Sequence, residues 1–170
     1  MYAFSAILTA AFGLDIADDT EDKELYRNYF EHMFHKLRIP AIKAGNCELK
    51  YESYKPYEEF VCDDIIEKQD GRQIQVGFFN EEFQFPAILE NDRIWMTITQ
   101  NEIETMKQPA EEAFGNVLTF GLGLGYYTYM VSEKENVDSV TVVEANKDVS
   151  GLFEKYILPQ FENRHKVKII

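Results

Sequence analysis

The chain has 170 residues, of which 45% are hydrophobic and 28% are charged, a composition typical of a globular protein with one domain or two small ones. Acidic residues outnumber basic ones by 30 to 17, and the net charge of −13 repels a phosphate backbone, so we expect no nucleic-acid partner. A small molecule or a protein is the expected substrate.

Residues 1–60 are predicted to form a helical N-terminal region. The apolar stretch 3–14 is too short to cross a bilayer and lacks the basic flank of a signal peptide, so we expect no membrane contact and a cytoplasmic location. Apolar residues then recur at helical spacing over 21–37. His32 and His35 lie on this predicted helix, but they lack the i, i+4 spacing of the zinc helix motif and have no third ligand, so we predict no metal site.

Aromatic residues recur every three positions between residues 51 and 60, at Tyr51, Tyr54, Tyr57 and Phe60. This spacing favours the aromatic face of a helix that is broken at Pro56 and packs on the rest of the protein. The two cysteines, Cys47 and Cys62, lack a metal-binding spacing and are expected to be free thiols.

Residues 61–98 are predicted to form a small antiparallel β region. Asp70-Gly71 is a hairpin signal between two β-prone runs, residues 65–66 and 74–76. Residues 83–89 and 94–98 form two further predicted strands, joined by a turn at Asn91-Asp92.

A predicted helix follows from Thr99 to about Gly115. Thr99 and Glu102 have the spacing of a capping box, in which the two side chains satisfy backbone N–H groups at the start of a helix. Pro109 either kinks this helix or begins a second one.

The most informative stretch is a short apolar run, Val117 to Phe120, followed by three glycines at alternate positions. Gly121, Gly123 and Gly125 can adopt positive φ and let a ligand approach the backbone closely. Residues 126–135 are predicted to be helical, with free N–H groups at the helix start. Glu144 follows 19 residues after Gly125, at the end of the next predicted strand, where a carboxylate can accept hydrogen bonds from a ribose diol.

This β-α-β pattern, with Gly-x-Gly-x-Gly and an acid closing the second strand, resembles the first motif of the class I S-adenosylmethionine-dependent methyltransferases over roughly residues 100–170. The resemblance implies an α/β fold with a partial doubly wound, Rossmann-like sheet over 99–170. It also implies that S-adenosylmethionine is the cofactor, with Gly121, Gly123, Gly125 and Glu144 as the binding residues. Many such enzymes carry an acid where this chain has Thr119, and the aminopropyltransferases of polyamine synthesis tolerate another residue there.

The last predicted elements are an amphipathic helix capped by Asn146 and a strand at 167–170. Right-handed crossovers predict the order of third, second and first strand in the sheet, which leaves the glycine strand at an edge. The resemblance implies that a complete methyltransferase domain continues beyond this point, so the catalytic half is expected to be missing. We therefore expect a truncated domain or an edge covered by a partner, by a swapped segment or by the N-terminal part.

Three functions remain open from the sequence. The first is an S-adenosylmethionine-binding, methyltransferase-like protein acting on a small molecule or a protein, with Trp95 and Tyr127 as candidate pocket walls and no assignable catalytic residue. The second is an aminopropyltransferase-like enzyme, because the predicted β region resembles in layout the small N-terminal sheet of that family. The third is a non-catalytic module that dimerises through the exposed sheet edge. The glycines can also serve only as a tight turn.

Overall fold

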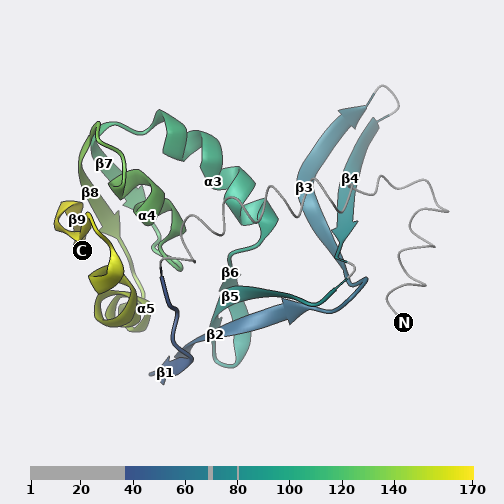
Figure 1. The fold of residues 1–170 in the computed structure, drawn as a ribbon, viewed down its shortest axis with the longest axis horizontal. Helices are drawn as coiled ribbons and strands as arrows, with labels where there is room; N and C mark the ends of the chain where they lie inside the picture. The colour runs from purple at the N-terminus through teal and green to yellow at the C-terminus, as the bar shows by residue number, and fades with distance from the viewer. Residues whose placement is uncertain (1–36, 69–70, 80) are drawn as a thin grey trace.

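The computed structural model describes residues 37–68, 71–79 and 81–170 as a mixed α/β fold (Figure 1). The predicted helices within 1–36, together with His32 and His35, lie outside the described residues. A three-stranded parallel sheet with helices α4 and α5 lies at one end of the molecule, and a β-hairpin lies at the other (Figure 1). A four-stranded antiparallel sheet and helix α3 lie between them (Figure 1).

The parallel sheet has the order β7-β8-β9, as predicted. β7 and β8 are each followed by a polar or glycine-rich turn and then by a helix. The elements of this unit are β7 (Gly115–Phe120), α4 (Tyr126–Ser132), β8 (Val137–Val143), α5 (Lys147–Leu152) and β9 (Val167–Ile169). A π-helical turn, Phe153–Ile157, continues α5, and two short 3-10 turns, Leu158–Gln160 and Arg164–Lys166, precede β9.

Antiparallel strands occur within residues 61–98, where a β region is predicted, and also before it, between residues 42 and 60. The hairpin pairs β3 (Glu59–Lys68) with β4 (Gly71–Phe78), and the four-stranded sheet has the order β1-β2-β5-β6. Its strands are β1 (Ile42–Ala44), β2 (Cys47–Tyr54), β5 (Phe83–Glu90) and β6 (Arg93–Thr97). Helix α3 (Gln100–Glu112) then leads into the parallel sheet.

The broken helix predicted for residues 41–60 is wrong, because this stretch forms β1, β2 and the beginning of β3. Buried residues in β2 alternate, with Cys47 and Leu49 at 0% and 1% exposure. Period two is the signature of a half-buried strand. Tyr54 stacks on Phe60 from the next strand, with ring centroids 4.7 Å apart, so the aromatic residues meet across strands and not along a helix.

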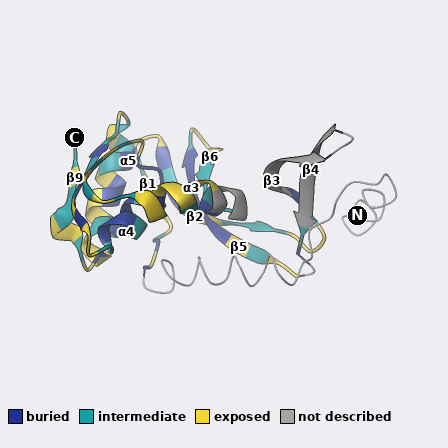
Figure 2. Cartoon of the chain, turned by 90° about the horizontal axis from the view of Figure 1, so that it is seen from above, coloured by how far each residue is buried: buried dark blue, intermediate teal, exposed yellow. Residues whose placement is uncertain are grey.

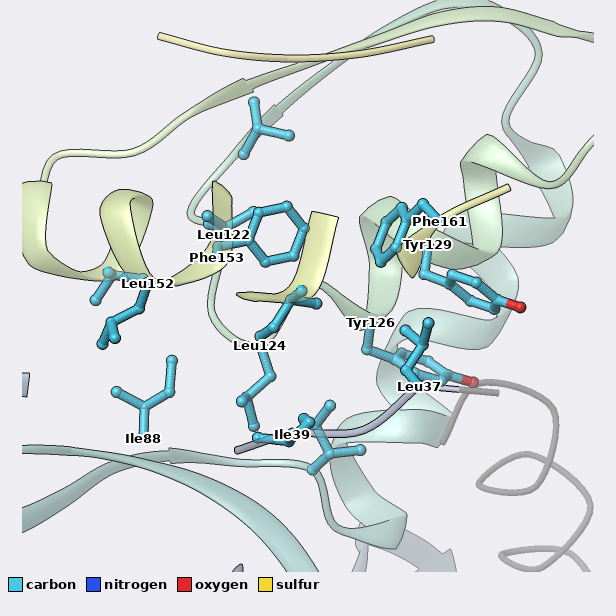
Figure 3. Packing of buried hydrophobic residues seen from close by; sticks show 14 of the residues in the cluster. Leu37, Ile39, Ile88, Leu122, Leu124, Tyr126, Tyr129, Leu152, Phe153 and Phe161 are labelled. Atoms are coloured by element: carbon cyan, nitrogen blue, oxygen red, sulfur yellow. The ribbon is translucent and has the colours of Figure 1, made fainter. Parts of the chain in front are cut away.

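One hydrophobic core joins the antiparallel and parallel sheets (Figure 3). It contains Leu49 and Ile88 from the antiparallel sheet and Val140, Val142 and Phe153 from the parallel unit. Figure 3 shows the Phe153 ring among the leucines of the glycine turn, with the Phe161 and Tyr129 rings beside it. The two sheets therefore stabilise each other through shared burial of apolar surface.

The parallel sheet is covered on one face only within the described part of the chain. Val140 and Val142 of β8 are fully buried in the core with residues of α4 and α5, whereas Leu118 and Phe120 of β7 are 59% and 75% exposed. Helices α4 and α5 both carry buried residues (Figure 2). Because the helices that follow β7 and β8 pack against the same face, the side chains of β7 on the opposite face are exposed.

Strand β7 forms an edge of the parallel sheet, since β8 is its only paired neighbour among the described residues.

Within the same residues, no helix has the length and apolar character needed to cross a membrane.

Candidate functional site

The glycine turn lies at the carboxyl end of β7, as the sequence predicts. Gly121, Gly123 and Gly125 all have positive φ, at 82°, 52° and 79°. Only glycine adopts this region without a steric cost from Cβ. The Gly121 N–H donates to the Val143 carbonyl at 2.9 Å, which ties the beginning of the turn to the neighbouring strand.

The three glycines have different surroundings. A Cβ on Gly125 would lie 2.1 Å from the ring of Phe153, which is 1% exposed, and a Cβ on Gly123 would lie 1.9 Å from Sδ of Met96. These two glycines are needed for packing within the protein. A Cβ on Gly121 would meet nothing within 4 Å, so Gly121 alone presents open backbone surface to a ligand.

Glu144 directs its carboxylate at the glycine turn. Its Oε2 accepts a hydrogen bond from the Leu122 N–H at 2.8 Å, and its Oε1 accepts one from the Asn146 N–H at 2.7 Å. The side chain is half-buried. Each carboxylate oxygen has two lone pairs, so each retains an acceptor position for a hydroxyl group of a ligand.

Asn146 connects this carboxylate to the rest of the fold. Its Oδ1 accepts hydrogen bonds from the N–H groups of Asp148 and Val149 and thus caps α5, as predicted. Its Nδ2 donates to Oε1 of Glu90 in β5 at 3.1 Å. The backbone around Glu144 is thereby held by both sheets, and the carboxylate is preorganised.

A pocket of about 350 Å³ opens beside the glycine turn. Thr119, Gly121 and Gly123 are among the residues that line this pocket. Trp95 of β6 and Tyr127 of α4, the two candidate pocket walls, both line it. Its size lies within the range of pockets for small molecules.

Glu102 also lines this pocket, which the sequence reasoning missed by assigning it to a capping box. Helix α3 begins where predicted, but the Thr99 side chain makes no capping hydrogen bond. The Glu102 carboxylate has no hydrogen bond or ion pair to another described residue, and burial raises its pKa above the usual value. The only signal in the sequence was a carboxylate soon after Trp95 and Met96.

A second pocket of about 350 Å³ lies between α3 and α4 and is lined mainly by apolar side chains. The Lys134 ammonium borders it and donates to the Ala110 carbonyl at 2.8 Å, so this charge is used to cap α3. The pocket does not include the glycines of the turn.

Other candidate chemistry is limited in the described ranges. Cys47 is a free, buried thiol whose pKa is raised by burial, as expected of an unreactive cysteine. The side chain of Cys62 is outside the described parts. No cluster of three or more potential metal ligands occurs between residues 37 and 170 where side chains are described.

Comparison with known proteins adds no assignment to this geometry. No protein-family model matches the chain, and no curated protein is significantly similar to it. Functional inference therefore depends on the turn, the carboxylate and the pocket.

Proposed function

We propose that this chain binds S-adenosylmethionine at the carboxyl end of its parallel sheet and belongs, in fold and chemistry, with the Rossmann-like methyltransferases. The observation that carries the proposal is the pairing of Glu144 with the glycine turn. Its carboxylate and the open backbone of Gly121 flank the same turn, from β8 and β7 respectively. Ligands of open parallel sheets bind in this position, beyond the carboxyl ends of the strands.

The donor set fits an adenosyl group. The free acceptor positions on Glu144 suit two ribose hydroxyls, and the pocket beside Gly121 can accommodate the chain attached to the ribose. Such a cofactor supplies a methyl group activated by a sulfonium. The protein would contribute chiefly by positioning, which can lower a transfer barrier substantially.

Titration calorimetry with S-adenosylmethionine and S-adenosylhomocysteine tests this proposal. We expect both to bind, and we expect Glu144→Gln to weaken binding about tenfold, because hydrogen bonds to a charged acceptor are stronger than those to a neutral one. Titration with the decarboxylated cofactor distinguishes an aminopropyltransferase-like preference.

Glu133→Gln is the matched control for this substitution and should leave the affinity unchanged. Glu133 also accepts a hydrogen bond, from the Asn163 side chain at 3.1 Å, but it lies at the end of α4 away from the glycine turn. Equal affinity of the wild-type protein and Glu144→Gln, or no binding by the wild-type protein, would contradict the proposal. Melting curves without ligand separate lost affinity from lost folding.

The exposed edge of β7 favours a second candidate function, association of two copies through this strand. One edge of β7 is hydrogen-bonded to β8, and Leu118 and Phe120 on the same strand expose large apolar side chains. An exposed apolar edge strand is a ready template for pairing with another chain.

Light scattering at several protein concentrations tests this association. We expect a dimer that Leu118→Lys converts to a monomer, because a charged side chain on an edge strand opposes pairing with another chain. Ile94→Lys is the control, since Ile94 is similarly exposed, at 58%, but lies in β6 of the four-stranded antiparallel sheet. A wild-type protein that is monomeric at all concentrations would exclude this function.

A further inference from the structure

We propose that the pocket beside the glycine turn binds the ammonium group of an amine substrate, with Glu102 as its counter-ion. The assignment of this amine as a substrate depends on the proposed cofactor site, whereas the binding of an ammonium group does not.

The first observation is the state of the Glu102 carboxylate. It borders the pocket, is half-buried, and has no hydrogen bond or ion pair to another described residue. Removing a carboxylate from water without a partner is unfavourable, so a cation that enters the pocket gains a strong partner there. Position in the first turn of α3 gives it only the weak stabilisation of the helix dipole.

The second observation is the aromatic lining of the pocket. Trp95, Tyr126 and Tyr127 contribute rings, and Met96 and Met106 contribute polarisable thioethers. Aromatic faces attract ammonium groups, and tryptophan does so most strongly. A carboxylate and several aromatic rings around one small pocket select a cation over a neutral or anionic group. The net charge of −13 also favours the approach of cations.

The third observation is the origin of these residues. Glu102 comes from α3 and Trp95 from β6, whereas the proposed cofactor contacts come from the β7 turn and the end of β8. The glycine turn borders the pocket through Gly121. An amine held by Glu102 would therefore lie next to the cofactor, in a subsite built by a different part of the chain.

Trp95 is the single tryptophan of the chain and lines this pocket, so its fluorescence should respond when a ligand enters. We would titrate the full chain with 2-phenylethylamine and with 2-phenylethanol, which differ only in the ammonium and hydroxyl groups. The expected result is an affinity about tenfold higher for the amine, reflecting a charge-assisted contact. Glu102→Gln should remove this preference, and Glu102→Asp should keep part of it.

Glu112→Gln is the matched control, because Glu112 is an exposed residue of the same helix outside the pocket. It should leave the preference unchanged. Equal affinities of the two probes for the wild-type protein, or a preference that survives Glu102→Gln, would overturn the proposal. Melting curves confirm that each variant is folded.

A repeat of the titration with saturating S-adenosylhomocysteine separates a substrate from the cofactor's own ammonium group. Simultaneous binding of this ligand and the amine supports a substrate subsite, and competition between them overturns that assignment. A Glu102-dependent amine preference in a protein that binds neither S-adenosyl compound would leave ammonium binding in place and refute only the proposed function. Cofactor binding that depends on Glu144, together with an amine preference that Glu102→Gln does not change, would support the proposed function and refute only the ammonium site.

Discussion

The glycine turn separates two flanks of the molecule that differ in how their polar groups are satisfied. On the packed flank, formed by β8 and α5, Glu144 accepts a backbone hydrogen bond on each oxygen and Phe153 fills the space behind Gly125. On the open flank, formed by β6, α3 and the edge of β7, Glu102 has no partner among the described residues and Leu118 is exposed.

This difference indicates a division of roles around one turn. The packed flank holds a carboxylate in a fixed geometry, as a site that positions a cofactor requires. On the open flank, the Glu102 carboxylate has no partner among the described residues and Leu118 is exposed to solvent. Such groups are the ones that binding of a ligand or a second protein stabilises most. The glycines can be used to test this division, because all three share positive φ while their neighbours differ.

Gly125→Ala should have the largest effect on stability. The new methyl group meets the buried Phe153 ring, which is enclosed by the core and packs edge-on against Phe161 at 5.5 Å between centroids. Overpacking and the cost of positive φ together amount to roughly 2 to 5 kcal/mol of unfolding free energy. Thermal unfolding should show a fall of roughly 4 to 20 °C in Tm.

Gly123→Ala is the comparison for this substitution. Its methyl group meets the end of the Met96 side chain, which can move more readily than a buried ring, so the loss of stability should be smaller. A larger loss of stability in Gly123→Ala than in Gly125→Ala would contradict the view that side chains on the packed flank are held more rigidly than those on the open flank.

Gly121→Ala should have a smaller effect on stability but a specific effect on binding. Nothing lies within 4 Å of the new methyl group, so only the backbone strain remains, about 1 to 2 kcal/mol. Gly115→Ala at the other end of β7 is closely matched, with φ of 63° and equally open surroundings. Both should lower Tm similarly, but only Gly121→Ala should weaken S-adenosylmethionine binding in calorimetry.

An equal loss of affinity in both variants would show that the effect passes through the strand and not through contact with a ligand. An unchanged affinity in Gly121→Ala would remove the open backbone from the proposed site, whatever the outcome of the Glu144 substitutions.

Several features of the fold could be predicted from short stretches of the sequence. Local patterns were sufficient for the β3–β4 hairpin, the β7-α4-β8 succession and the Asn146 cap, because hairpin signals, glycine turns and caps act over a few residues. The predicted helix after the turn was too long, since α4 ends at Ser132 and not at residue 135.

Features that depend on distant contacts could not be predicted in the same way. Nothing in the sequence joins Gly123 to Met96 or Gly125 to Phe153, because these pairs meet only when the two sheets share a core. Glu102 has the capping-box spacing, yet its environment is set by the tertiary fold. The period-three aromatic pattern around Tyr54 was misleading for the same reason: its ring contacts are made between strands.

The smallest expected effect concerns two tyrosines of α4 that belong to opposite flanks. Tyr129 is buried against Phe161 on the packed flank, and burial together with the charges of Glu133 and Glu162 raises its pKa to about 12. Tyr127 lines the pocket on the open flank, and burial raises its pKa as well.

A folded-state pKa above the unfolded value of about 10 means that the unfolded chain releases this proton first. Stability should therefore fall as pH rises from about 10 to about 12. We would measure Tm against pH for each variant and subtract the difference from wild type that is already present below pH 9. The remaining fall in Tm at alkaline pH should be reduced more by Tyr129→Phe than by Tyr127→Phe. Equal curves for the two variants would show that the flanks do not differ in how strongly they exclude water.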